Sequence, residues 1–226
     1  MPILNKETSL YPNDLLDEAL QALTSPADEA DERKDWWSVY TRSRQEKQLM
    51  RKLLKLETPF CCPTIERRYR SPAGRLRCVH EALFSNYVFI FGTAQVRYDA
   101  LTTNCVAQCK KVADGLQLTD DLRQIQGLID TGAALTLESK LTKGDRVRVR
   151  TGTFAGYEGT VLHRDNEKRL MVSVRFMQKG ASILLDDCQL ELISSSDEET
   201  KGKIDVVYVL PNNRRQELSL PNQPSR

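Results

Sequence analysis

Apolar and polar residues alternate with a period of two along several stretches of the chain, and this pattern predicts short strands. The clearest stretch is Arg146–Arg150, where Val147 and Val149 alternate with arginines, as on a strand with one buried and one solvated face. Four more short strands are expected at 160–162, 170–176, 182–185 and 189–193. Five strands between residues 141 and 193 predict a small five-stranded β-barrel.

The middle of the chain mixes strands with helices, so the expected fold class is α+β. Residues 43–56 carry leucines and a methionine at helical spacing, and Thr119 with the acids after it predicts a second helix over 119–130. The run 84–91 is apolar at nearly every position. It is either a central strand or a strand with an exposed apolar face. A further strand is expected at 36–41, an extended segment at 60–62, and a hairpin formed by 65–70 and 75–79.

Charge divides the first half of the chain into two segments. Residues 1–35 contain three basic and nine acidic residues, whereas residues 36–113 contain fourteen basic and five acidic residues. The acidic segment is expected to be a largely disordered arm with room for one helix, and one interpretation is that it lies on the basic domain as a mimic of nucleic acid. The basic domain favours a polyanionic partner. The alternative is a solvated charged face that binds nothing.

Several classes of protein are disfavoured. The sequence has neither an apolar run long enough to span a membrane nor a secretory signal at its start. Its six cysteines lack paired CxxC elements, and His80 and His163 stand apart in the sequence, so we expect no metal site and no cofactor. No phosphate loop or paired nucleophile and base is visible. The protein is therefore not expected to be an enzyme, and its thiols fit a reducing cytoplasm.

Glycines and aromatics follow the alternating strand in the run TGTFAGYEG. Such closely spaced glycines suit a tight turn with positive φ angles. With the flanking strands, the run gives the pattern GDxVxVxxGxFxGxxGxV, which resembles the KOW module of the NusG transcription factors and of several ribosomal proteins. The residues that carry the resemblance are Gly144, Val147, Val149, Gly152, Phe154, Gly156, Gly159 and Val161.

The order of elements before this module resembles the NusG family, and most closely its RfaH-like antitermination branch. Trp36–Leu56 is similar to the family's opening tryptophan strand and first helix, and Phe84–Ile90 to its aromatic strand. The resemblance covers residues 36–193. It implies a ferredoxin-like N-terminal (NGN) domain at 36–130, a linker at 131–140 and an SH3-like KOW barrel at 141–193, between the arm at 1–35 and a polar tail at 194–226 with one extra strand near 204–210.

The resemblance also implies how the N-terminal domain works. In this family the domain binds the clamp helices of the largest RNA polymerase subunit and suppresses pausing or termination. The matching residues here are Tyr87 and Phe89, with Phe84 nearby, and the alternative is that these aromatics are core residues. Specialised members also contact non-template DNA in the transcription bubble. The candidates for nucleic-acid contact are Arg68, Arg70, Arg75, Arg77, Arg97 and Tyr98.

The KOW module of the family recruits a second partner, either Rho or a small-subunit ribosomal protein. The matching residues are Phe154, Phe176 and Met177, although Phe154 also fits a role in packing. In RfaH this module refolds into helices that mask the polymerase site. The alternation over RVRVR and LMVSVRF predicts a stable barrel here.

The function expected is therefore transcription elongation or antitermination by a monomer bound to RNA polymerase in the bacterial cytoplasm. The alternative is a ribosome-associated or RNA-binding KOW protein. The sequence leaves open whether the factor is general or serves particular operons.

Overall fold

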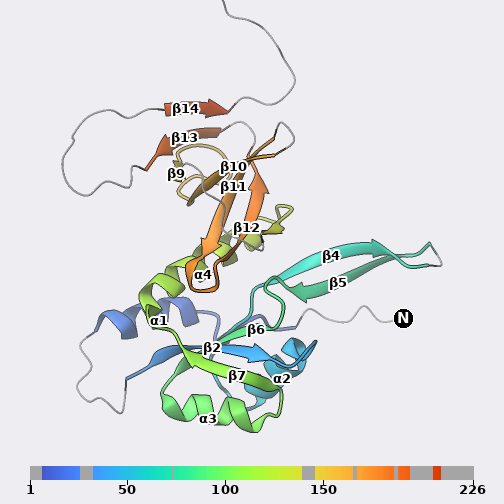
Figure 1. Ribbon diagram of the computed structural model, residues 1–226, viewed down its shortest axis with the longest axis vertical. Coiled ribbons are helices and arrows are strands. Elements are labelled where there is room, and N and C mark those ends of the chain that lie inside the picture. Colours follow the sequence, from blue (N-terminus) through green and yellow to red (C-terminus); the bar gives the residue numbers. More distant parts are fainter. Residues whose placement is uncertain are drawn as a thin grey trace, which may run out of the picture. The chain divides into compact units, whose positions relative to one another are not determined.

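The computed structural model describes residues 7–25, 33–72, 74–138, 146–164, 167–185, 188–193 and 206–209, and its elements are drawn in Figure 1. The chain forms two compact units. The first contains Met1–Lys143 and Met171–Ile183, and the second contains Gly144–Leu170 and Leu184–Arg226. Helices and antiparallel sheets follow one another along the chain, so the expected α+β class is confirmed.

The first sheet has five strands in the order β1-β3-β6-β2-β7. Its two longest partners, β2 and β6, pair antiparallel from Asp35 opposite Gly92 to Tyr40 opposite Tyr87. Both are rich in aromatic and β-branched residues, which favour strands. The strands are β1 (Leu10–Tyr11), β2 (Asp35–Thr41), β3 (Phe60–Cys61), β6 (Tyr87–Gly92) and β7 (Val106–Lys111).

Alternation along β2 gives this sheet two different faces. Trp37 and Val39 point to one face, and Trp36, Ser38 and Tyr40 point to the other. Helices α2 (Glu46–Lys55) and α3 (Ala94–Thr102) cover the first face (Figure 1). The apolar stripe expected on α2 is confirmed, because it contributes to a core whose buried members include Val39, Leu49, Met50, Leu53, Val88, Ile90 and Ala100.

Helices α1 (Leu15–Thr24) and α4 (Gly115–Asp130) lie on the other face (Figure 1). Helix α4 buries Leu118, Leu122 and Ile125 at helical spacing. It begins at Gly115 rather than at Thr119, because the Asp114 carboxylate accepts a 2.9 Å hydrogen bond from the Gln117 N–H and caps the helix. No helix in the described part of the chain is long and apolar enough to cross a membrane.

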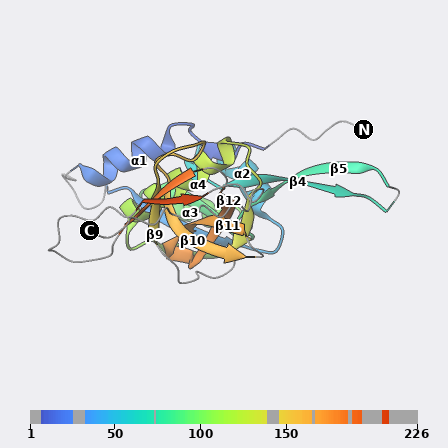
Figure 2. The same ribbon diagram turned by 90° about the horizontal axis from the view of Figure 1, so that it is seen from above.

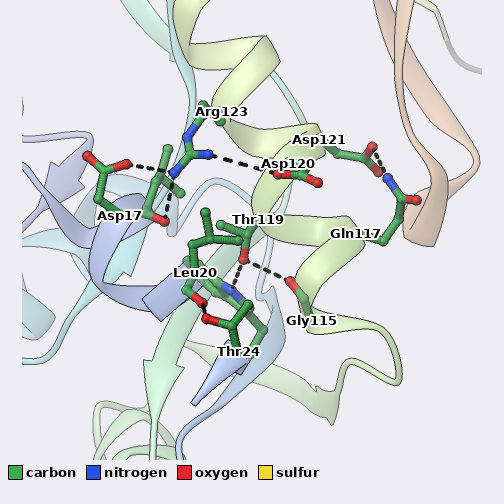
Figure 3. A network of polar contacts seen from close by, with 11 residues as sticks. Asp17, Leu20, Thr24, Gly115, Gln117, Thr119, Asp120, Asp121 and Arg123 are labelled. Atoms are coloured by element: carbon green, nitrogen blue, oxygen red, sulfur yellow. Dashed lines mark hydrogen bonds and ion pairs between the residues drawn. The ribbon is translucent and has the colours of Figure 1, made fainter. Parts of the chain in front are cut away.

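Residues 7–25 do not form the disordered arm that was expected, because they belong to the first unit; the single helix that the sequence allowed there is present as α1. Strand β1 pairs with β3, and α1 buries Leu15, Leu16 and Ala19 completely or nearly so. Its acids lie on the exposed side, where the Asp17 carboxylate accepts a 2.6 Å hydrogen bond from Arg123 of α4 (Figure 3). The acidic composition thus hides an amphipathic helix. The run at 26–32 lies outside the described residues.

A buried polar contact joins α4 to β2. The Trp36 indole N–H donates a 2.8 Å hydrogen bond to the Thr119 hydroxyl, which itself donates to the Gly115 carbonyl at 2.8 Å (Figure 3). Both side chains have zero exposure. Thr119 is therefore a buried residue in the second turn of α4, and its hydroxyl fixes the rotation of that helix against the strand.

The sequence pattern predicts no element over residues 94–111, where the structure has α3 and β7. Helix α3 fully buries one residue, Ala100, so the sequence shows little apolar periodicity there. Strand β7 lies at the sheet edge and carries Lys110 and Lys111, and charged residues commonly protect such an edge. Tertiary packing rather than local pattern explains both elements.

The hairpin predicted over 65–79 is present and extends to Ala82. It is formed by β4 (Thr64–Arg70) and β5 (Leu76–Ala82), paired in register from Thr64 opposite Ala82 to Arg70 opposite Leu76. These two strands make a separate sheet, which extends away from the five-stranded sheet in both views (Figure 1; Figure 2).

The remaining strands form a seven-stranded sheet in the order β14-β13-β9-β10-β11-β12-β8. All five strands expected between residues 141 and 193 are present, and the helical structure described in that range is one 3-10 turn, Arg175–Met177. The extra strand expected in the tail is also found, but the rest of the tail lies outside the described residues. The strands are β8 (Thr136–Glu138), β9 (Arg146–Val149), β10 (Glu158–Arg164), β11 (Glu167–Val174), β12 (Lys179–Leu184), β13 (Cys188–Leu192) and β14 (Val206–Val209).

The glycine-rich run forms the turn between β9 and β10. Gly152 and Gly156 have φ angles of 88° and 91°, a region that glycine adopts without steric cost. The Gly156 N–H donates to the Val149 carbonyl at 2.7 Å, and the Val149 N–H donates to the Tyr157 carbonyl at 2.9 Å. These bonds close the turn and confirm the role expected for its glycines.

Candidate partner-binding surfaces

Tyr87 lies at the start of β6, at one end of the sheet face that carries Trp36. Its ring meets the Tyr40 ring edge-on at 5.2 Å between centroids, and the Lys179 ammonium lies 5.0 Å from the Tyr87 ring centroid. Tyr40 is 40% exposed. The two rings line a pocket of about 330 Å³ together with Ser38, Gln108, Lys110, Phe176 and Met177. Tyrosine rings, which are apolar but carry a polar hydroxyl group, suit a surface that is solvated in the free protein and excluded from water when a partner binds.

The other two candidates for polymerase contact are buried. Phe84 has 1% exposure and Phe89 has 0%, and Phe89 lies between Ser38 of β2 and Cys61 of β3 in the sheet. For these two residues the structure favours the alternative interpretation, core packing. Tyr87 is half-buried, so it is the one of these three residues whose side chain a partner could contact.

The hairpin arginines are exposed, but they do not form one basic face. Residues directly opposite each other in the ladder share a face. Arg68 and Arg70 therefore share a face with Cys78 and Leu76, whereas Arg77 lies opposite Tyr69 on the other face. Arg75 precedes β5 and its carbonyl accepts from the Ser71 N–H at 2.9 Å. The distal hairpin thus presents arginines on both sides, next to the exposed side chains of Tyr69 and Leu76.

Arg97 of α3 is held by aromatic rings. Its guanidinium carbon lies 5.8 Å from the Trp37 ring centroid and 5.7 Å from the Tyr98 ring centroid, within the range of cation–π attraction. Tyr98 is 56% exposed, so a ring and a cation are available to a nucleic-acid strand side by side. Because Trp37 and Tyr40 point to opposite faces of the sheet, this pair and Tyr87 do not share one surface.

The residues predicted to bind a second partner have different environments. Phe154 is half-buried and meets Tyr157 edge-on at 6.5 Å between ring centroids, which supports its packing role. Phe176 is 40% exposed in the 3-10 turn. Phe176 and Met177 line the same pocket as Tyr87. Tyr87 was predicted to contact RNA polymerase, whereas Phe176 and Met177 were predicted to contact the second partner. A protein bound in this pocket would therefore contact residues from both predicted sets.

Buried cysteines lie beside this surface but are unsuited to catalysis. Cys61 and Cys62 are fully buried, and burial raises the pKa of both thiols, that of Cys62 to about 12 with a smaller contribution from the Glu46 charge. Such thiols stay protonated and unreactive at neutral pH. The Cys62 thiol donates to the Tyr87 carbonyl at 3.6 Å, which is a structural contact.

The structure also brings together three potential metal ligands that sequence spacing did not reveal. Ligand atoms of Glu66, Cys78 and His80 all lie within 4.8 Å of one another. Cys78 and His80 are two positions apart, but Glu66 lies 12 and 14 positions before them, so the signal that brings all three together is the register of the hairpin and not a local motif.

Along the chain, an α+β domain with a hairpin is followed by strands that carry the glycine-rich turn. Residues 34–127 match the family described as transcription termination factor nusG, and residues 143–175 match the KOW motif. No match was found among curated proteins. The order of the two matches supports a place for this chain in the NusG family. It also supports a role in transcription elongation or termination. Proteins of that family are non-enzymatic transcription factors. Strand β1 and helix α1 lie outside both matches.

Proposed function

We propose that this protein is a transcription elongation and antitermination factor that binds RNA polymerase through its first module. The observation that carries the proposal is the NusG match at 34–127 followed along the chain by the KOW match at 143–175. The five-stranded sheet with helices on both faces is consistent with a ferredoxin-like NGN domain, and the strands β9–β13 are consistent with an SH3-like KOW barrel. Its action as a monomer of the bacterial cytoplasm, in the RfaH-like branch, is part of this proposal.

In this proposal Tyr87, supported by Tyr40, contacts the clamp helices of the largest polymerase subunit. The support is the partly exposed pair of rings that line a pocket of mixed polar and apolar residues, since aromatic anchors that become buried dominate the binding energy of most interfaces. Phe176 and Met177 are proposed to contact the second partner, Rho or a small-subunit ribosomal protein. Phe154 contributes to that surface through the turn that it stabilises.

Nucleic acid is proposed to bind at two places. Arg97 and Tyr98 offer a stacked cation and ring to the non-template strand of the bubble. The hairpin arginines Arg68, Arg70, Arg75 and Arg77 are exposed and offer phosphate contacts whose strength falls steeply with salt.

A pull-down with core RNA polymerase tests the proposal. We expect Tyr87→Ala and Tyr40→Ala to weaken retention of the protein, whereas the matched control Tyr98→Ala, an exposed tyrosine on α3, retains wild-type binding in the absence of DNA. Retention that survives both changes would move the interface elsewhere. Failure of the wild type to bind polymerase, together with co-sedimentation with ribosomes, would favour the ribosome-associated alternative.

The DNA contacts need a separate assay. On an elongation complex with an exposed non-template strand, Arg97→Gln should reduce crosslinking of the protein to that strand without reducing retention on core polymerase. Substitution of Arg70 and Arg77 by glutamine should flatten the dependence of binding on salt. Unchanged crosslinking and salt dependence would exclude these residues as contacts.

A further inference from the structure

Three side chains of different chemistry meet on one face of the β4–β5 hairpin. Glu66 on β4 lies directly opposite His80 on β5, and Cys78 lies two residues before His80 on the same strand. Side chains two apart on a strand, and directly opposite across a ladder, point the same way. The hydrogen-bonded register therefore places a carboxylate, a thiol and an imidazole together, with their ligand atoms within 4.8 Å of one another.

This set of donors is selective in its chemistry. Thiolate, imidazole and carboxylate are the ligands of zinc, and three protein ligands with a fourth, open position are typical of zinc sites that keep a water molecule or bind another ligand. Magnesium and calcium prefer sites made of oxygen atoms alone. We propose that Glu66, Cys78 and His80 form a binding site for a zinc-class divalent metal ion.

The spacing of the ligands fits such an ion after small movements. Tetrahedral zinc with ligands at its usual bond lengths needs about 3.3–3.8 Å between ligand atoms. The separations between ligand atoms here are all within 4.8 Å, and rotation about side-chain bonds can shorten any that exceed the range that zinc needs. Glu66 and Cys78 are exposed and His80 is half-buried, so these side chains have room to rotate without disturbing a packed core.

One cation already occupies part of this face. The Arg68 guanidinium donates a 2.5 Å hydrogen bond to the Glu66 carboxylate, and Arg68 lies directly opposite Cys78. Exposed ion pairs of this kind contribute little net free energy. A divalent ion that gains three ligands should displace Arg68 from Glu66, and the arginine then swings free. Arg68 is thus a competitor of the metal, which gives the proposal a distinctive test.

The fourth position is accessible. Glu66 and His80 line a cavity of about 950 Å³, together with residues that connect α4 to β8. Water or a further ligand can therefore approach the metal from this side. The consequence for the hairpin is mechanical, because isolated two-stranded hairpins are marginally stable and a metal held by both strands would lock their register.

Cobalt(II) titration of the full chain, stripped of metal and kept reduced, tests the site. Thiolate ligation gives cobalt an intense near-ultraviolet charge-transfer absorption that carboxylate or imidazole ligation does not give. We expect wild-type protein to develop this absorption with one equivalent of cobalt, and zinc to remove it by competition. Cys78→Ser should abolish the absorption. His80→Asn and Glu66→Gln should keep it but weaken cobalt affinity by about tenfold or more, because loss of even an outer-sphere partner commonly costs that much.

Two further variants keep the test specific. Cys109→Ser removes a half-buried thiol on β7 and should leave the titration unchanged. Arg68→Gln should tighten cobalt binding, because it removes the competing cation. An absence of thiolate absorption in the wild type would overturn the proposal. So would absorption that persists in Cys78→Ser, or a cobalt affinity that Arg68→Gln leaves unchanged or weakens. The buried Trp36 reports by its fluorescence that each variant is folded.

Discussion

Replacement of Thr119 by valine should destabilise the first unit through one missing hydroxyl group. Valine keeps the shape of threonine but cannot accept the 2.8 Å hydrogen bond from the Trp36 indole. Both residues have zero exposure, so water cannot take the place of the hydroxyl. A buried donor left without a partner costs about 1–3 kcal/mol. We expect the free energy of unfolding to fall by about 2 kcal/mol.

Urea denaturation followed by circular dichroism measures this change, and a double-mutant cycle isolates the bond. Trp36→Phe removes the indole N–H, so Thr119→Val in that background leaves no unpaired indole. The double variant should therefore be more stable than the sum of the two single changes predicts, by about 1 kcal/mol. Thr102→Val is the matched control, because the Thr102 hydroxyl bonds to the Asp99 carbonyl at an exposed site. The reasoning fails if Thr119→Val costs no more than this control or if the cycle is additive.

Three other predictions follow from the packing. Leu15→Ala should lower the free energy of unfolding by about 2–5 kcal/mol, because Leu15 has zero exposure; a cost near that of the exposed control Leu56→Ala would show that α1 is not part of the folded unit. Gly156→Ala should cost about 1–2 kcal/mol, since alanine is strained at a φ of 91°; thermal denaturation that matches the wild type would contradict this. Burial raises the pKa of the Cys62 thiol from an ordinary 9.0 to about 12, so the thiol stays protonated in the folded chain while it ionises in the unfolded one. The contribution of this thiol to the free energy of unfolding should thus be constant below pH 9 and fall above pH 9 by about 1.4 kcal/mol per pH unit. The urea midpoints measured at pH 8 and pH 10 should therefore differ less in Cys62→Ala than in the wild type.

Period-two patterns predict strands well where a strand buries one face and exposes the other. Val147 and Val149 are buried between exposed arginines, so alternation recorded in the sequence corresponds to a real difference in environment. Apolar periodicity did not reveal α3, because this helix fully buries one residue, Ala100, and is packed against β6 and β7. It failed for the N-terminal segment as well, where composition averaged over 35 residues concealed the buried Leu15, Leu16 and Ala19, which share helix α1 with the exposed Asp17 and Glu18.

The candidate sites were predictable in position but not in exposure. The aromatic run on β6 forms a strand that is buried on both faces, so alternation could not predict which ring remains accessible. In the structure, the accessible ring on this strand is that of Tyr87. The sequence did not predict the metal-ligand set of Glu66, Cys78 and His80 for a different reason. Metal motifs are recognised by short spacings on one segment, whereas this set depends on a pairing that the Ser71–Arg75 turn imposes between two strands.

The two faces of the five-stranded sheet separate the protein's proposed tasks. Tyr87 lies on the face shared with α1 and α4, while Arg97 is held against Trp37 on the face shared with α2 and α3. A protein partner at Tyr87 therefore leaves Arg97 and Tyr98 open to a nucleic-acid strand. The hairpin is a third element, joined to the sheet through its base and exposed along its length. Its arginines are positioned by the register of two strands alone, so anything that fixes that register also fixes where those charges lie. On this reasoning a metal ion bound at Glu66, Cys78 and His80, as proposed, would fix the register of the two strands and with it the positions of the hairpin arginines.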